Sequence, residues 1–242
     1  MYAVVLFAIT IFSISYLAPC IFYAYIKYRP SCRMADESAG SQNTKYQTKS
    51  MYESQKFEHL LGTEGLSDGL LQSHFGLYEG YVKNTNLAAE KLQQIEAGTP
   101  EFAELKRRFG WEFDGMRMHE YYFGNLMKGG SVLEESMELK AQVEKDFGSV
   151  ENWEKDFRAT LAMRGIGWVV LYWDKEAQRL FNVWIGEHDG GHLVGCEPIL
   201  VVDVFEHAYI ADYGTKRPDY IEAIMKNVCF HVANARFIAA KQ

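Results

Sequence analysis

Cysteine is scarce in this sequence, and its spacing points to no metal or redox motif. The 242 residues contain four cysteines, and no two of them form a C-x-x-C pair: Cys20, Cys32, Cys196 and Cys229. This argues against a zinc ribbon and against a disulfide framework, which need closely spaced or numerous cysteines. It favours a reducing compartment, so we expect a cytoplasmic protein.

An excess of positive charge is also missing, since the formal net charge is −7. A protein whose main partner is nucleic acid presents a basic face to the phosphates, so we expect no nucleic-acid partner. No internal repeat is visible. An apolar content of 48% and a charged content of 24% are ordinary for a folded protein.

Residues 2–26 lack charged side chains altogether, and this run is long enough to span a bilayer. No positive residue precedes it, which argues against a cleaved signal peptide. Lys27, Arg29 and Arg33 follow it and would keep the folded part in the cytoplasm. Two readings stay open: a membrane anchor, or a stretch upstream of the true start at Met34. A membrane is a partner only in the first case, as a tether. Residues 1–50 thus form an apolar segment and a polar linker.

The next part of the chain has helical periodicity. Ser67 can cap a helix that begins near Asp68 and runs toward Leu92 or Ile95. Pro100 suits the first turn of a following helix, and we expect a long helix at about 112–127. This predicts an antiparallel helical hairpin over residues 51–128.

Residues 129–242 combine helices and strands. Two short helices are expected at 133–147 and at about 150–163, and Pro218 opens one of the last helices. Between them, 167–173, 180–185 and 199–203 are rich in β-branched and aromatic residues, which favours strands. We therefore predict an α+β protein: an N-terminal long antiparallel helical hairpin and a C-terminal α/β domain with a three-stranded antiparallel sheet.

Asp203 and His207 are the most informative pair. If their segment is helical, a spacing of four places a carboxylate and an imidazole on one face, where both can hold a metal ion. The surrounding string, DVFEHAY, is similar to the signature of the iron/manganese superoxide dismutases: Asp, any residue, Trp or Phe, Glu, His, a small residue, then two aromatics. The match ends at Ile210, where a second aromatic is usual. DYGTKRPDY downstream also resembles that family, and the resemblance covers about residues 55–240.

The resemblance implies a four-residue metal site. His74 lies in HFGLYEGYVKNTN and His119 in MHEYYFGNL, which are similar to the family's two helical ligand motifs. With Asp203 and His207 they form the implied ligand set. Three neutral imidazoles and one carboxylate suit iron or manganese, one ion per subunit. The other histidines match no ligand motif and are interpreted as structural or surface residues: His59, His192 and His231.

The first helical motif departs from the family by one residue. His74 and Tyr81 are seven apart, one fewer than usual, yet seven is close to two helical turns. We keep His74 as the ligand and expect a local change in helix winding. Leu77 or Tyr78 falls where the family often has a further His.

Several other residues resemble those that surround the family's metal. Tyr81 matches the tyrosine that lines the substrate funnel, and Trp168 matches an aromatic wall of the site. Glu206 and Tyr209 match residues that bridge two subunits, which implies a homodimer or homotetramer. Arg217, in KRPDY, is an implied attractor for the anionic substrate.

Two positions bear on the choice of metal. Typical iron enzymes carry a Gln at the position of Gly115, whereas typical manganese enzymes carry a Gly there, as this chain does. His188, in GEHDGG, stands where manganese enzymes supply a Gln to the bound solvent, and a His can donate there while still titrating. The implied catalytic residues beside the metal are therefore Tyr81 and His188, and iron, manganese and dual use stay open.

Taken together, the resemblance implies superoxide dismutation, with superoxide as substrate and oxygen and hydrogen peroxide as products. The alternative is a metal-free structural or interaction subunit with the same fold. Such a subunit should have lost ligands, whereas this chain keeps all four.

Overall fold

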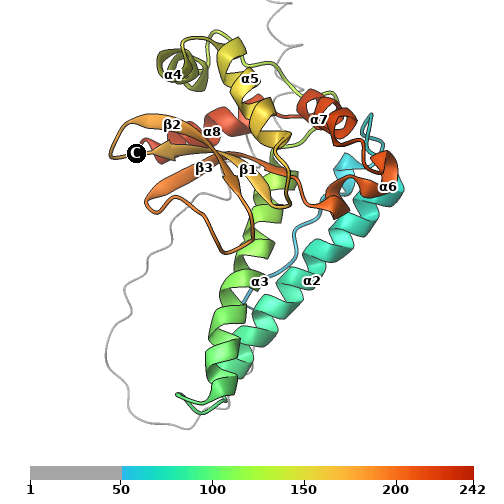
Figure 1. Ribbon diagram of the computed structural model, residues 1–242, viewed down its shortest axis with the longest axis vertical. Helices are drawn as coiled ribbons and strands as arrows, with labels where there is room; N and C mark the ends of the chain where they lie inside the picture. The colour runs from blue at the N-terminus through green and yellow to red at the C-terminus, as the bar shows by residue number, and fades with distance from the viewer. Residues whose placement is uncertain (1–50) are drawn as a thin grey trace, which may run out of the picture.

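The computed structural model describes residues 51–242, and the predicted anchor or linker at residues 1–50 lies outside them. The described part is α+β, as predicted, with helices followed by three strands and further helices (Figure 1). Its elements are η1 Glu58–Leu60, α2 Asp68–Leu92, α3 Pro100–Gly124, α4 Glu138–Phe147, α5 Val150–Leu161, β1 Trp168–Asp174, β2 Arg179–Ile185, β3 Cys196–Asp203, η2 Glu206–Ala208, α6 Ile210–Tyr213, α7 Arg217–Lys226 and α8 Phe230–Ala240.

Helices α2 and α3 lie side by side as the predicted hairpin, which extends away from the rest of the molecule (Figure 1). Each begins at a side-chain cap. The Ser67 hydroxyl accepts from the Leu70 amide at 3.1 Å, and the Thr99 hydroxyl accepts from the Phe102 amide at 3.2 Å. Pro100 occupies the first turn of α3, as expected. The long helix expected at about 112–127 is part of α3, which extends back to Pro100.

The three strands form one antiparallel sheet in the order β2-β1-β3, so β1 is central. Trp168, the first residue of β1, pairs with Asp203 on β3 and with Ile185 on β2. The central strand is buried along almost its whole length, which explains its unbroken run of apolar residues. This register places the start of β1 beside the end of β3.

The C-terminal helices cover the sheet and join it to the hairpin. Helices α4 and α5 contact β2, while α8 and α3 contact β3. The Met127 amide donates to the Asn227 carbonyl at 2.9 Å, so the end of the hairpin is bonded to the chain after α7. The domain boundary at 128/129 stays a prediction. Helix α4 begins at Glu138 rather than near 133, and residues 127–137 before it form turns and irregular chain. An isolated bridge joins Leu126, at the end of the hairpin, to Val228.

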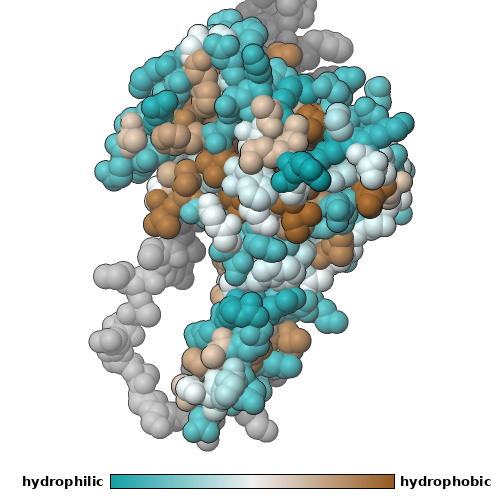
Figure 2. All heavy atoms as spheres, viewed as in Figure 1, coloured by the Kyte–Doolittle hydropathy of each residue, from teal (hydrophilic) through white to brown (hydrophobic). Residues whose placement is uncertain are grey.

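The surface seen in Figure 2 is mostly polar, with apolar side chains in small groups over the C-terminal part. Within residues 51–242, no helix combines the length and the apolar character needed to cross a membrane.

Candidate metal centre

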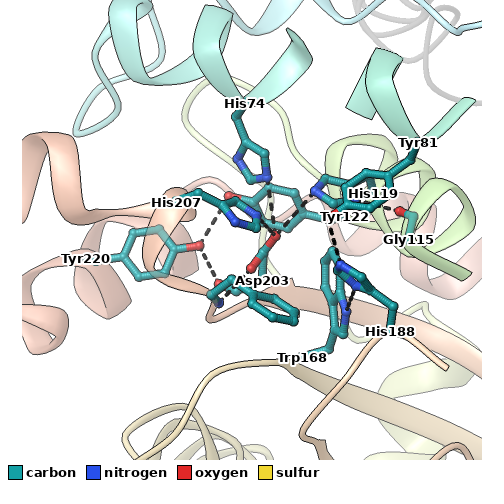
Figure 3. A network of polar contacts seen from close by, with 11 residues as sticks. His74, Tyr81, Gly115, His119, Tyr122, Trp168, His188, Asp203, His207 and Tyr220 are labelled. Carbon is teal, nitrogen blue, oxygen red and sulfur yellow. Dashed lines mark hydrogen bonds and ion pairs between the residues drawn. The ribbon is translucent and has the colours of Figure 1, made fainter. Parts of the chain in front are cut away.

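Four side chains from separate elements converge where the hairpin meets the sheet (Figure 3). His74 comes from the second turn of α2, His119 from the last turns of α3, Asp203 from the end of β3, and His207 from η2. Each offers one ligand atom, and these four atoms lie within 4.8 Å of one another. The four residues predicted as ligands are thus brought together.

The carboxylate of Asp203 is at the centre of this group. Its Oδ2 lies 3.2 Å from Nε2 of His74, 3.2 Å from Nε2 of His207 and 3.7 Å from Nε2 of His119. Only the His207 contact has the alignment of a hydrogen bond. Within the described residues, the buried Nε2 atoms of His74 and His119 have no hydrogen-bond partner. Buried polar atoms are nearly always bonded, so two such atoms facing one carboxylate need an explanation.

Hydrogen bonds outside the group fix the orientation of its members. Nδ1 of His119 donates to the Gly115 carbonyl at 2.6 Å, which leaves Nε2 with a free lone pair toward Asp203. The Phe205 amide donates to the other carboxylate oxygen of Asp203 at 2.8 Å. The Tyr220 hydroxyl donates to the Asp203 carbonyl at 2.7 Å.

The charges of the group follow from burial and from the one carboxylate. Burial lowers the pKa of His74 and lowers that of His119 further, so both rings are neutral near pH 7. Burial opposes charge on Asp203, but the adjacent His207 holds its pKa below the usual range. Burial also opposes charge on His207, yet Asp203 outweighs it and raises the pKa of His207. The group is therefore one carboxylate among three imidazoles.

This donor set fits an iron or manganese ion. Nε2 of His119 has a free lone pair, and Nε2 of His74 has no hydrogen-bond partner among the described residues. The ring of His207 bonds to the same carboxylate, and the ligand atoms of all four residues lie close together. A divalent ion among them would take up the two orphaned Nε2 atoms and the carboxylate charge. Imidazole with carboxylate is a ligand combination suited to such metals.

Asp203 and His207 do not share a helix face, which corrects the helical premise of the sequence argument. Asp203 is the last residue of β3, and His207 lies in the three-residue 3-10 turn η2. The chain bends between them at Val204 and Phe205, and Val204 donates to the Gly167 carbonyl at 2.8 Å. A strand end followed by a tight turn thus produces the proximity expected from a helix.

The expected change in helix winding is wrong as well, because α2 is an unbroken α-helix over all 25 residues. Seven residues give about two turns of regular helix, so His74 and Tyr81 reach the same side without distortion. Tyr78 lies on this side too. It is buried, and its hydroxyl donates to Glu120 at 3.1 Å and accepts from the Gln55 amide at 2.9 Å.

Trp168, His188 and Tyr81 form a chain of hydrogen bonds beside the four residues (Figure 3). Nε1 of Trp168 lies 3.1 Å from Nδ1 of His188, and Nε2 of His188 lies 2.8 Å from the Tyr81 hydroxyl. An indole N–H can only donate, so Nδ1 of His188 must accept. The proton of the neutral ring is therefore on Nε2 and is donated to Tyr81.

Burial keeps this chain in one protonation state. It lowers the pKa of His188 to about 4 and raises the pKa of Tyr81 to about 12. A protonated His188 would also place its Nδ1–H against the N–H of Trp168. Near pH 7 the imidazole is thus neutral and the phenol keeps its proton.

The residues predicted to bridge subunits lie at the edge of the site. Glu206 is exposed, whereas Tyr209 is buried and stacks on Tyr220 at 5.3 Å between ring centroids. Arg217 donates to the Gly165 carbonyl at 2.7 Å, and its guanidinium lies 6.0 Å from the Tyr209 ring. Arg217 thus lies near Tyr209, which follows the ligand His207 by two residues.

Sequence reasoning missed three aromatic residues that support the site. Trp111 lies 4.7 Å from the ring of His188 and 5.4 Å from that of Tyr81, and its N–H donates to Glu187 at 3.0 Å. Tyr122 bonds to the Tyr220 hydroxyl at 3.2 Å, which connects α3 to α7. No spacing signal exists for partners 98 residues apart.

Comparison with known proteins agrees with this site. A family model described as iron/manganese superoxide dismutases, C-terminal domain, matches residues 135–236. An iron superoxide dismutase of Cupriavidus metallidurans is 38% identical over 182 residues, which are 73% of this chain and 90% of the relative. One of Aquifex pyrophilus is 36% identical over 183 residues, 72% of this chain and 85% of the relative.

Relatives that are named as manganese superoxide dismutases match this chain at a similar sequence identity. A manganese superoxide dismutase of Haloferax volcanii is 34% identical over 177 residues, which are 71% of this chain and 87% of the relative. Similarity at this level extends over the hairpin as well as the C-terminal part. The chain therefore belongs to the iron/manganese superoxide dismutase family.

Proposed function

We propose that this protein is a superoxide dismutase, which converts superoxide to oxygen and hydrogen peroxide at a single iron or manganese ion. The ion would be held by His74, His119, Asp203 and His207. The observation that carries this proposal is the convergence of four ligand atoms within 4.8 Å, two of them buried imidazole nitrogens that lack a partner among the described residues. Membership of the family supports the same activity.

The chemistry that a bound iron or manganese ion supplies is one-electron transfer, first from one superoxide and then to another. The overall reaction consumes two superoxide ions and two protons and yields one oxygen and one hydrogen peroxide. The protein must therefore hold the ion at a suitable potential and deliver protons to the peroxide.

The ligand residues set the charge of the site. Asp203 contributes the single negative charge, while burial keeps His74 and His119 neutral. The Gly115 carbonyl holds the proton of His119 on Nδ1, so Nε2 stays available for the metal. The resulting site would offset one of the two positive charges of a divalent ion.

Tyr81 is the proposed proton donor, and His188 orients it. Because Nε2–H of His188 donates to the Tyr81 oxygen, the phenolic proton is free to point elsewhere. The pKa of Tyr81, raised to about 12 by burial, keeps that proton in place until a stronger base arrives. The pKa of His188, lowered to about 4, leaves its imidazole neutral near pH 7, so it has no second proton to deliver.

Either metal suits the donor set, and the two positions that bear on the choice point in different directions. Gly115 is typical of manganese enzymes, and His188 leaves iron or dual use open. Relatives of both names match the chain. Loading the metal-free protein with each ion separately, then comparing activity per bound ion, decides between them.

We further propose a homodimer, or a homotetramer built from it, with Glu206 and Tyr209 at the subunit contact. Exposure of Glu206 next to the half-buried His207 supports this, since a partner subunit could reach both. We place the enzyme in the cytoplasm, with tethering through residues 2–26 as the alternative. Cell fractionation of the full chain separates these two locations.

The activity is tested by measuring the decay of superoxide after a pulse that generates it. Full-chain protein with bound iron or manganese should accelerate the decay in proportion to protein concentration, well beyond the same amount of free ion. Protein that carries the ion but leaves the decay unchanged would favour a structural subunit. A matched His59→Ala variant, altered at an exposed histidine, should keep the wild-type rate.

A further inference from the structure

The loop between β2 and β3 carries His188 and is rich in glycine. Residues 186–195 read GEHDGGHLVG, so four of the ten are glycine. Gly191 has a φ of +99°, a conformation that other residues rarely adopt, and Val194 is fully exposed. Glycine-rich loops have high backbone entropy when free, so holding a side chain in place from such a loop requires external anchors.

His192 connects this loop to the central strand. Its Nε2 lies 2.6 Å from the carbonyl oxygen of His188, and its Nδ1 lies 2.7 Å from the Tyr172 hydroxyl. A carbonyl oxygen only accepts, so Nε2 of His192 carries a proton. In the neutral ring, the Tyr172 hydroxyl then donates to Nδ1. Tyr172 is buried within β1, which makes it a rigid end point.

The same strand therefore holds His188 at two points. Trp168, the first residue of β1, bonds to the imidazole of His188. Tyr172, four residues along β1, bonds through His192 to the backbone carbonyl of His188. Together these bonds fix both the position of the residue and the direction of its ring. The ring in turn donates to the Tyr81 hydroxyl at 2.8 Å.

We propose that His192 is a positioning residue for superoxide dismutation, which holds the His188 imidazole at hydrogen-bonding distance from Tyr81. This rests on the proposed function, because it assigns a task within that reaction. His192 contacts none of the four ligand residues through a hydrogen bond, so it acts through His188. In this proposal, His192 is a structural residue whose task is to keep the His188 imidazole in position.

The hydrogen-bonding groups and the size of the side chain explain why a histidine suits this place. It must donate on one side and accept on the other while spanning the gap between a carbonyl and a hydroxyl. A Gln side chain offers the same pair of functions, an N–H donor and a C=O acceptor, on a similar length. Ala offers neither, so the carbonyl of His188 would lose its anchor.

The test is a double-mutant cycle on metal-loaded, full-chain protein. His192→Ala should lower turnover per bound ion by roughly tenfold, the order expected for one lost hydrogen bond at a functional group, with the metal content unchanged. His192→Gln should restore most of the loss. His188→Ala combined with His192→Ala should be no slower than His188→Ala alone, because the proposal has His192 act through His188.

A His59→Ala variant is the matched control, since it removes an exposed histidine. Wild-type turnover by His192→Ala, or losses that multiply in the double variant, would overturn the positioning role. If the metal-loaded wild type itself fails to consume superoxide, the proposed function falls instead.

The crystal structure of His192→Ala holoprotein tests the geometry independently of activity. The hydrogen bond between His188 and Tyr81 should be lost or lengthened beyond 3.5 Å, the limit for such a bond. An unchanged 2.8 Å contact would show that Trp168 alone suffices to hold His188.

Discussion

Gly115 and Tyr81 are in contact so close that any side chain at position 115 would force the Tyr81 ring to move. A β-carbon built on Gly115 would lie 2.6 Å from Cδ1 and 2.8 Å from Cε1 of Tyr81. Real carbon atoms do not approach to this distance without displacement. The absence of a side chain at 115 therefore determines where the Tyr81 ring lies. The Gly115 carbonyl also accepts a hydrogen bond from His119. Gly115 therefore contacts both the ligand His119 and the proposed proton donor Tyr81.

Gly115→Ala should displace Tyr81 while the metal ligands stay in place. We expect a loss of about 1–3 kcal/mol in the free energy of unfolding, typical of overpacking. Turnover per bound ion should fall by between about tenfold and a hundredfold, since small misplacements of catalytic groups are costly. Gly80→Ala is the matched control, because a β-carbon there meets nothing within 4 Å. Equal behaviour of the two variants would contradict the contact.

His188 should make the stability of the protein depend on pH. Its folded-state pKa, about 4, lies below the unfolded value of 6.5, so the unfolded chain takes up the proton first as the pH falls. Its contribution is complete above pH 6.5 and is lost as the pH falls toward 4. The full effect is about 3 kcal/mol at 1.36 kcal/mol per pKa unit.

His188→Gln removes this titration and keeps an N–H donor. Between pH 7 and pH 4, the wild type should lose about 3 kcal/mol more unfolding free energy than His188→Gln. Denaturant unfolding of both proteins at equal metal content measures the difference. Identical pH profiles would mean that His188 is not held neutral by its surroundings.

Glu206→Ala should weaken the subunit contact. Glu206 is exposed in the single chain and precedes His207, so we expect its carboxylate to bond across the interface. Light scattering over a dilution series should show the variant dissociating at higher concentration than the wild type, with lower metal retention. Glu176→Ala, in the exposed turn after β1, is the control. A wild type that is monomeric and fully active at nanomolar concentration would refute the proposed dimer.

The sequence predicted the fold well where local chemistry decides it. The cap at Ser67, Pro100 in a first helical turn and the apolar runs of the strands each have a local cause, and the structure contains the corresponding elements. The helical pattern at 112–127 does not show that the same helix reaches back to Pro100, because the stretch after Pro100 is mostly polar and exposed. Such a stretch gives little periodic signal, although it is held against α2.

The candidate site also combines features that the local sequence predicts with features that arise only from the tertiary fold. Asp203 and His207 were recognised by their motif, yet the geometry behind the motif is a strand end and a 3-10 turn rather than a helix. Partners such as Tyr122 and Tyr220, or Tyr172 and His192, meet only through the tertiary fold. The residues that flank these side chains in the sequence carry no pattern that would predict either contact.

One ion, held by the four converging residues, is expected to perform the reaction. The direct measurement is a titration of metal-free full-chain protein with iron or manganese, in which bound ion and superoxide consumption are followed together. We expect activity to rise in proportion to bound ion and to stop at one ion per chain. His119→Ala, which removes a buried ligand atom, should neither retain the ion nor gain activity. Full metal occupancy in His119→Ala, or superoxide consumption that is independent of bound ion, would contradict the account.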